Sequence, residues 1–221
     1  MSYQTADAKR EFDSWSNGYD RNLLQWIFFG PSHRMLLEEI DNSHERILDV
    51  GCGTGIFAAK ALQHFPDAQV WGMDLSDGML RQCRARCEAA EGRLHLVQGD
   101  SQRLPFADDS FDVITCTHSF HHYPKQQKAV SEMHRVLRPG GKLLIIDGDR
   151  DRAWGWLIYD VIVVMAEGAV RHLTSGAFRE MYEDVGFAEV SHRRRRGLLP
   201  ILMTIGTAVK TAKPAITRRA A

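Results

Sequence analysis

Apolar residues in this chain follow two alternating patterns. Short continuous runs with the length of buried strands occur at residues 47–50, 69–73, 93–97, 111–116 and 142–146. Between them, apolar residues recur every three or four positions, as in amphipathic helices, at residues 56–62, 77–90 and 125–137. Strands that alternate with helices form a mostly parallel sheet with helices on both faces. The pattern therefore predicts an α/β fold with a Rossmann-like, doubly wound sheet.

The amino-terminal segment has helical spacing over residues 4–42, interrupted at Gly30-Pro31. We expect helices broken at that dipeptide. Phe12, Trp15 and Tyr19 share one helical face, which either packs on the domain or covers a ligand.

The carboxyl-terminal third carries two further elements. Residues 154–170 predict a helix that is apolar on nearly every side, so it is fully buried, or a wall of an apolar substrate pocket, or a self-association face. Before it, Asp147 opens a charged run with the composition of a solvated loop. Residues 188–195 and 198–208 alternate as a hairpin, which requires one antiparallel strand at the sheet edge.

A glycine-rich turn follows the first predicted strand. Gly51, Gly53 and Gly55 alternate there, and the segment after them has the pattern of a helix. Glycine adopts backbone conformations that are closed to other residues, and it lets the main chain approach a ligand. The start of the helix offers free N–H groups to a polar ligand. A ligand is therefore expected against this turn.

Two acidic residues narrow the choice of ligand. Asp74 ends the second predicted strand, 19 positions after Gly55, where an acid is placed to accept both hydroxyls of a ribose. Asp49 precedes the glycines, where it is unsuited to a pyrophosphate but suited to an ammonium group. The loop also lacks the G-x-G-x-x-G spacing of dinucleotide enzymes. These features indicate a nucleoside that carries a positive charge.

The segment from Asp49 to Gly55 resembles motif I of the class I S-adenosylmethionine-dependent methyltransferases. Three more stretches stand in the order of that family: Gly99-Asp100-Ser101 with Leu104-Pro105-Phe106, Phe111 to Ile114, and Val136 to Leu143. The resemblance covers roughly residues 45–150. It implies a methyltransferase core over residues 43–209, an amino-terminal helical lid over residues 1–42 and a frayed tail over residues 210–221.

The resemblance implies a set of residues that bind S-adenosylmethionine. Asp49 and Gly51 would hold the methionine end, Asp74 the ribose, and Asp100 with Ser101 the adenine. The full predicted set is Tyr19, Asp49, Gly51, Gly53, Gly55, Asp74, Leu75, Met79, Asp100, Ser101 and Thr117. Two alternatives stay open. Asp100 could serve only to cap the following turn, and Leu75 and Met79 could be core residues rather than neighbours of the adenine.

Three histidines and a tyrosine lie within residues 117–123, where the methyl acceptor would bind. His121 and His122 are the candidate catalytic residues, because a histidine titrates near neutral pH and can remove a proton from the acceptor. The alternative for both is packing at a helix start. His118 with either of them approaches the spacing of a metal site, but no carboxylate follows at ligand distance, so no metal is predicted.

Composition and charge exclude several classes. The 28 basic and 28 acidic residues cancel, which disfavours general nucleic-acid binding. His192 to Arg196 is a dense basic run, interpreted as an exposed strand edge that discourages strand addition rather than a contact with acidic lipid. The sequence has no signal-peptide pattern and no apolar stretch of transmembrane length. The four cysteines fit neither a zinc site nor a disulfide framework, so a cytoplasmic protein is expected.

These observations predict an enzyme that moves a methyl group from S-adenosylmethionine to an O, N or C atom of a small, partly apolar acceptor. A quinone, a lipid amine and a secondary metabolite all satisfy this description. The D/N-P-P-Y/F tetrapeptide of amino-methyltransferases that act on nucleic acid is missing after the fourth strand. The alternatives are a non-catalytic subunit that binds the cofactor and a nicotinamide-dependent oxidoreductase. A homodimer and a peripheral membrane contact both remain open.

Overall fold

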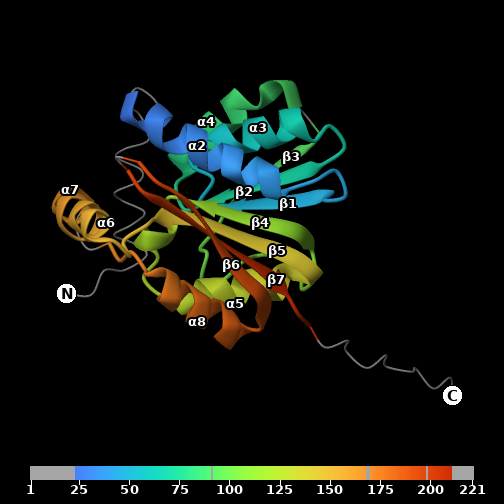
Figure 1. Cartoon of the computed structure of the whole chain (residues 1–221). Helices are drawn as coiled ribbons and strands as arrows, with labels where there is room; N and C mark the ends of the chain where they lie inside the picture. The colour runs from blue at the N-terminus through green and yellow to red at the C-terminus, as the bar shows by residue number, and fades with distance from the viewer. Residues whose placement is uncertain (1–22, 91, 168–169, 198, 211–221) are drawn as a thin grey trace, which may run out of the picture.

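The computed structural model describes residues 23–90, 92–167, 170–197 and 199–210. Within them a seven-stranded sheet has the order β3-β2-β1-β4-β5-β7-β6 (Figure 1). The strands are β1 (Arg46–Val50), β2 (Gln69–Asp74), β3 (Leu94–Gln98), β4 (Phe111–Thr117), β5 (Leu137–Gly148), β6 (Phe187–Arg195) and β7 (Ile201–Ala208). The five strands from β1 to β5 are parallel. The predicted doubly wound sheet is confirmed.

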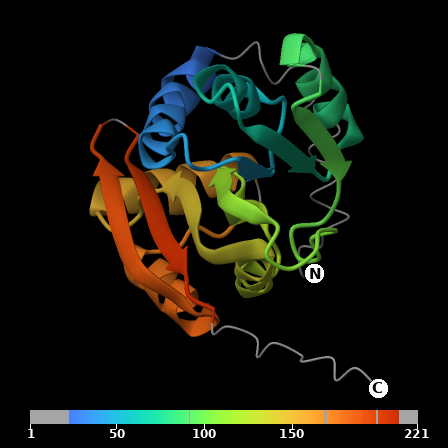
Figure 2. The same cartoon turned by 90° about the vertical axis from the view of Figure 1, so that its right-hand side faces the viewer.

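Helices cover both faces of the sheet (Figures 1 and 2). They are α2 (Leu23–Glu39), α3 (Ile56–His64), α4 (Asp77–Arg86), α5 (Gln126–Val136), α6 (Ala153–Trp156), α7 (Val163–Glu167) and α8 (Ser175–Val185), with short turns η2 (Glu88–Ala90) and η3 (Phe120–His122) and a π-helical segment η4 (Leu157–Ile162). Helices α2, α3 and α4 pack on one face, and α5 and α8 pack on the other. Ser76 caps the amino terminus of α4, because its hydroxyl accepts a hydrogen bond from the Met79 N–H.

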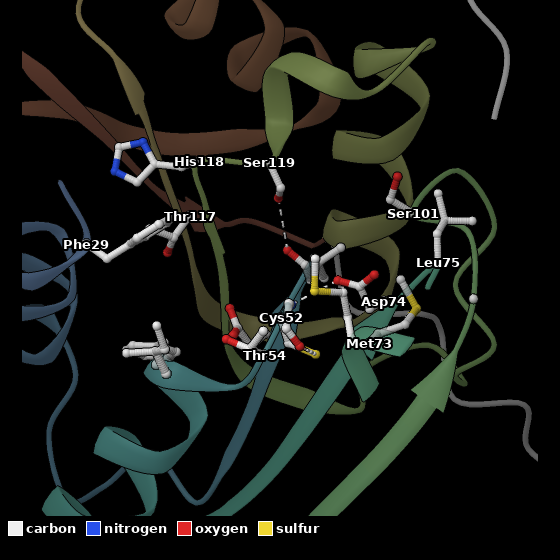
Figure 3. A pocket seen from close by; sticks show the side chains of 18 of the residues that line it. Phe29, Cys52, Thr54, Met73, Asp74, Leu75, Ser101, Thr117, His118 and Ser119 are labelled. Atoms are coloured by element: carbon white, nitrogen blue, oxygen red, sulfur yellow. Dashed lines mark hydrogen bonds between the residues drawn. The ribbon is translucent and has the colours of Figure 1, made fainter. Parts of the chain in front are cut away.

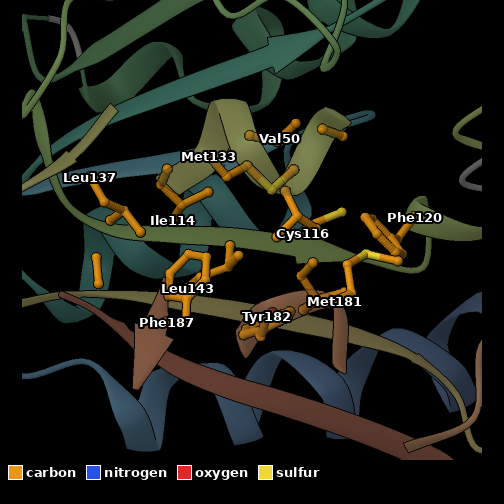
Figure 4. Packing of buried hydrophobic residues seen from close by; sticks show 14 of the residues in the cluster. Val50, Ile114, Cys116, Phe120, Met133, Leu137, Leu143, Met181, Tyr182 and Phe187 are labelled. Carbon is orange, nitrogen blue, oxygen red and sulfur yellow. The ribbon is translucent and has the colours of Figure 1, made fainter. Parts of the chain in front are cut away.

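Successive side chains of the central strands point to opposite faces of the sheet and pack into two separate hydrophobic cores. Ile47, Leu144 and Ile146 point toward α2 and α3, whereas Leu48, Leu143 and Ile145 point toward α5 and α8. Figure 4 shows the second core, in which residues of β4 and β5 meet α5 and α8. A strand buried on both faces needs apolar residues at successive positions, which explains the continuous apolar runs.

The antiparallel strand lies inside the sheet, which corrects its predicted place at the edge. Strand β7 pairs with β5 on one side and with β6 on the other, both in antiparallel register. Leu202 and Met203 of β7 are fully buried and require cover on both faces. Strand β6, rather than β7, forms the edge of the sheet (Figure 2). It ends in arginines, and charged side chains are compatible with an exposed edge strand.

Helix α2 runs without interruption through Gly30-Pro31, so the predicted break is wrong. Pro31 has no N–H to donate, which removes one helical hydrogen bond. After Pro31, the side chains of Met35, Leu36 and Ile40 are buried against the domain. This burial stabilises the helix as a packed element, although an isolated helix would be broken at the proline.

Residues 147–167 also differ from expectation. Asp147 and Asp149 are buried rather than part of a solvated loop, because β5 extends to Gly148 and pairs there with Ile201 of β7. The apolar segment beyond them buries only its Ile158 and Tyr159 side, so the alternative of a fully buried helix is wrong. The Tyr159 hydroxyl donates to the Pro200 carbonyl at 2.8 Å, which fixes that side.

The described chain ends at Lys210, which is anchored rather than frayed. Its ammonium group donates to the Arg135 carbonyl at 2.7 Å and also contacts Asp109 and the Leu137 carbonyl. The rest of the predicted tail lies outside the described residues. Of the helices in the described part of the chain, none combines the length and hydropathy needed to cross a bilayer.

Candidate functional site

A pocket opens at the carboxyl edge of the sheet, between β1 and β4. The strand order reverses at this point, because β2 lies on one side of β1 and β4 on the other. Ligands of doubly wound sheets bind at such switch points. The predicted residues that line the pocket are Asp49, Gly51, Gly53, Asp74, Leu75, Met79, Ser101 and Thr117. In Figure 3, Leu75 and Ser101 lie toward one end of the pocket, and Phe29 and His118 toward the other.

The glycine turn is hydrogen-bonded to the end of β2. The N–H groups of Gly51 and Cys52 both donate to the Met73 carbonyl, at 2.8 and 3.0 Å. The Gly53 N–H donates to Asp74 Oδ2 at 2.9 Å. Gly51, Gly53 and Gly55 all have positive φ values, of 73°, 51° and 79°. The turn therefore needs glycine for its backbone conformation at each position.

The space beside each glycine differs. A Cβ at position 51 would overlap the Ser119 side chain, and one at position 55 would overlap Cys83 of α4. A Cβ at position 53 would meet no protein atom within 4 Å, and Gly53 lines the pocket. Gly51 and Gly55 thus permit packing within the protein, whereas Gly53 leaves room for a ligand.

Asp74 stands at the middle of the pocket with its carboxylate already oriented. Asp74 Oδ1 accepts from the Ser76 N–H at 2.9 Å, while Oδ2 holds the Gly53 N–H. These bonds connect the end of β2, the glycine turn and the start of α4. Asp74 as a whole is only 8% exposed, and it lines the pocket.

Asp49 is a second buried acid on the pocket wall. Its Oδ1 accepts from the Thr115 hydroxyl of the neighbouring strand at 2.8 Å. Burial raises the pKa of Asp49 to about 7, and the nearby charge of Asp74 adds to the rise. A carboxylate that is desolvated in this way gains most from a cationic partner.

The opposite end of the pocket is formed by an aromatic cluster, Phe29, His33, Phe57 and His118. Phe29 stacks on His33 with ring centroids 5.7 Å apart and meets His118 edge-on at 5.3 Å. His33 also contacts the ring of Phe57 at 5.7 Å. Burial lowers the pKa of His33 to about 3, so this imidazole is neutral. The cluster therefore presents uncharged ring surface on the His33 side.

His118 joins helix α2 to the carboxyl end of β4. Its Nε2 lies 2.8 Å from the Ser32 hydroxyl, and its backbone N–H donates to the Ile146 carbonyl at 2.8 Å. Its φ of 50° is unusual for a residue other than glycine. Such strained conformations concentrate at functional sites.

Not every predicted residue reaches the pocket wall. Asp100 turns toward its own loop, where its Oδ1 accepts from the Gln102 N–H at 2.9 Å, as in the capping alternative. Gly55 packs on Cys83. Tyr19 lies outside the described residues, and so do Phe12 and Trp15.

His121 and His122 lie in a buried cluster with Asp147 and His172 rather than on the pocket wall. Asp147 Oδ1 lies 2.7 Å from His121 Nδ1 and 3.6 Å from His172 Nε2. Burial lowers the pKa of His122 to about 2, so His122 is neutral. Of the three histidines in residues 117–123, only His118 lines the pocket. It is therefore the histidine best placed to contact a methyl acceptor.

The same cluster brings three metal-ligating side chains together, with their ligand atoms within 4.8 Å of one another. The Asp147 carboxylate, however, is already engaged by three donors. Its Oδ1 accepts from His121 and from the Gly148 N–H at 2.9 Å, and its Oδ2 accepts from the His121 N–H at 3.0 Å. These bonds, and the charge of the histidines, keep the pKa of Asp147 below its usual range against the effect of burial. The Asp147 carboxylate is thus held by hydrogen bonds from within the protein.

Comparison with known proteins decides the family. The methyltransferase domain family matches residues 47–141. The ubiquinone/menaquinone biosynthesis C-methyltransferase UbiE of Dinoroseobacter shibae is 33% identical over 210 residues, which cover 82% of this chain and 83% of that protein. The chain belongs to the class I S-adenosylmethionine-dependent methyltransferases. This membership sets aside the nicotinamide-dependent and non-catalytic alternatives.

Two further comparisons agree with this family. The malonyl-acyl-carrier-protein O-methyltransferase of Methylococcus capsulatus is 43% identical over 132 residues, which cover 60% of this methyltransferase and 48% of that protein. The solved structure of the YcgJ protein of Bacillus subtilis superposes with a TM-score of 0.71 and 18% identity, over 82% of this chain and all of that one. The latter likeness concerns the fold alone.

The pocket of this methyltransferase suits its cofactor. Gly53 leaves open space beside the main chain, and Asp49 offers a buried carboxylate for a positively charged methionine end. Asp74 offers a preoriented carboxylate for hydroxyl groups. The cofactor itself supplies a methyl group that its sulfonium has already activated.

The raised pKa of Asp49 predicts an unusual dependence on pH. The folded protein retains a proton on Asp49 that the unfolded chain loses above pH 3.8, so stability should fall as pH rises from about 4 to about 7. In urea unfolding, the stability of the wild type relative to Asp49→Asn should fall by roughly 3 kcal/mol across this window. A pH profile that is the same for both proteins would contradict this assignment.

Several site residues could not be found from sequence. Phe29, His33 and Phe57 carry no motif, and Thr115 sits unremarkably within a strand. Only the position of Thr115 beside Asp49 in the β1–β4 register reveals its role. The strand-end position of His118 is a usable signal, because residues just after parallel strands face the site.

Proposed function

We propose that this methyltransferase acts on a small acceptor with a planar, apolar ring, such as a quinol. The observation that carries the proposal is the aromatic cluster, which forms one end of the cofactor pocket with rings from α2, from α3 and from His118 just after β4. Flat aromatic faces stack well on a planar ring. The relatives named as quinone C-methyltransferases support the same class of acceptor.

We assign the cofactor to the opposite part of the pocket. Asp49 and Gly51 would hold the methionine end, Asp74 the ribose, and Leu75, Met79 and Ser101 the adenine. The positions of Leu75 and Ser101 support the assignment, because they lie at the end of the pocket away from Phe29 and His118, with Asp74 between the two ends (Figure 3). Asp100 would act indirectly, by shaping the turn that presents Ser101.

The protein has little covalent chemistry to perform. It must hold the acceptor atom in line with the methyl group at roughly 3–3.5 Å and keep water away. Phe29 and Phe57 would exclude water. His118 would accept a proton from an acceptor hydroxyl, with the Ser32 hydroxyl at 2.8 Å holding the ring in place. His121 and Asp147 would support the loop that carries His118.

Replacement of His118 should separate turnover from cofactor binding. We expect His118→Ala to lower kcat by roughly a hundredfold or more, the usual contribution of a general base. The affinity for S-adenosylmethionine, measured by calorimetry, should stay within about threefold of the wild type, because His118 lies at the acceptor end. Ser32→Ala is the matched control for the orientation of the His118 ring, and it should lower kcat less than His118→Ala does. A large loss of cofactor affinity in His118→Ala would contradict the assignment.

The acceptor class is tested by offering three chemistries to the purified protein. Release of S-adenosylhomocysteine would be followed with a demethylated quinol, with a neutral lipid amine and with a phenolic metabolite. The proposal expects turnover with the quinol, reduced by Phe29→Ala. Turnover with the amine alone would overturn it.

Three further proposals concern the amino-terminal segment, the cellular location and the contacts of this enzyme. We propose that residues 1–42 act as a lid, which is supported by the contribution of Phe29, Ser32 and His33 from α2 to the site. We also propose a cytoplasmic enzyme, supported by four free, buried cysteines. A homodimer and a peripheral membrane contact both require an exposed apolar surface, and the segment from Trp154 to Met165 provides one.

A further inference from the structure

Most of the large apolar side chains that are exposed among the described residues lie on one segment. Among the described residues, six large apolar side chains are exposed, and five of them lie between Trp154 and Met165. They are Trp154 at 50%, Trp156 at 50%, Leu157 at 38%, Ile162 at 54% and Met165 at 83% exposure. A cluster of this kind on a folded protein marks an interaction surface.

The tertiary structure places a basic group beside these tryptophans. Arg194, Arg195 and Arg196 at the end of β6 line a cavity of about 600 Å³ together with Arg152 and Trp154. Arg194 is paired with Asp149 at 3.5 Å and with Asp151. Within the described part of the chain, no acidic side chain forms a salt bridge with Arg152, Arg195 or Arg196. We call the five apolar residues and these three arginines the apolar-basic surface.

The apolar-basic surface lies at the same edge of the sheet as the cofactor pocket. Strand β5 ends at Gly148, which pairs with Ile201 at the start of β7, and Ile201 pairs with Arg195. The hairpin end with its arginines is therefore at the carboxyl edge of the parallel strands, where Asp49 and Asp74 also lie. In Figure 1, α6 and α7 stand beside that end of the hairpin.

We propose that the apolar-basic surface docks this methyltransferase on a bilayer that contains anionic phospholipid. Tryptophan and aliphatic side chains insert at the boundary between headgroups and acyl chains, and arginines beside them attract anionic headgroups. A second copy of the chain is a weaker match, because a two-fold interface would bring two sets of arginines together. Docking at this edge would let an apolar acceptor pass from the bilayer toward the pocket. That last step rests on the proposed function, whereas the docking itself does not.

The test is sedimentation of the full-length protein with vesicles of phosphatidylcholine alone and of phosphatidylcholine mixed with phosphatidylglycerol. We expect binding to the mixed vesicles only. Arg195→Gln with Arg196→Gln should weaken it by roughly tenfold or more, because each basic residue near an anionic surface contributes attraction. Trp154→Ser with Trp156→Ser should weaken it by a similar factor, about tenfold, by removing the inserted rings.

Matched controls come from the rest of the surface. Val209→Ser removes an exposed apolar residue outside the segment, and Arg81→Gln with Arg84→Gln removes two exposed arginines on α4. Neither should change vesicle binding. Absence of binding to the mixed vesicles, or equal binding by all variants, would overturn the proposal. So would a dimer in light scattering that Trp154→Ser with Trp156→Ser dissociates while vesicles do not bind. Calorimetric binding of S-adenosylmethionine, measured in parallel, reports separately on the proposed cofactor site.

Discussion

Asp74→Ala should weaken the binding of S-adenosylmethionine by roughly a hundredfold to ten-thousandfold, because a hydrogen bond to a charged group contributes about 1.5–3 kcal/mol and two to the ribose are lost. The carboxylate is preoriented by the Gly53 and Ser76 N–H groups, so no reorganisation is needed when hydroxyls bind. Isothermal titration calorimetry with S-adenosylmethionine and S-adenosylhomocysteine measures the effect. Both ligands should lose affinity to the same extent, because they share the ribose.

A nearby acid provides the control for Asp74. Asp77 lies three positions further along, is exposed and pairs with Arg81 on the surface of α4. Asp77→Ala removes the same charge from the protein and should leave the dissociation constant within about twofold, since surface ion pairs contribute little. Asp74→Asn tests whether shape alone suffices, and we expect it to bind more tightly than Asp74→Ala. Equal cofactor affinity in Asp74→Ala and Asp77→Ala would remove the ribose role from Asp74.

Gly55→Ala should lower the free energy of unfolding by about 2–5 kcal/mol, a large share of the 5–15 kcal/mol typical of a domain. Two causes add. The residue has a φ of 79°, which strains any side chain, and a Cβ there would lie 3.0 Å from Cys83 Cα and overlap the Cys83 sulfur. Urea unfolding of the protein without ligand measures the loss. The mutated residue lines no part of the pocket, so the cofactor affinity of the protein that remains folded should change little.

Gly53→Ala is the matched substitution, and the opposite result is expected. The backbone strain is similar, at a φ of 51°, but a Cβ would meet no protein atom. Stability should therefore fall by only about 1–2 kcal/mol, whereas cofactor affinity should fall strongly because the methyl group stands in the pocket. For Gly55, adding Cys83→Ala should restore part of the lost stability, which a double-mutant cycle reveals. Equal stability losses at the two glycines would argue against packing on Cys83.

Much of the fold was decided locally along the chain. The continuous apolar runs specified strands buried on both faces, and the helical spacing between them specified the layers, because both signals depend on neighbours in sequence. Gly51, Gly53 and Asp74 could be found for the same reason, since a turn and a strand end are local features. The parts of the pocket that we assign to the cofactor are mostly of this kind.

Interactions between distant segments decided the rest. Pro31 stays within a helix because Leu36 and Ile40 bury against the domain, and local propensity cannot include that contribution. His118 rather than His121 or His122 reaches the pocket, because its backbone takes a positive φ while Asp147 of β5 draws His121 inward.

The apolar segment from residue 154 and the arginines that end β6 are far apart in sequence, and neither pattern shows that they meet. Their meeting depends on β7 inserting between β5 and β6. Sequence periodicity thus determined which elements form and which of their faces are apolar. Long-range packing determined which side chains meet at the acceptor end and which apolar residues remain exposed, because burial is a property of the assembled layers rather than of any one segment.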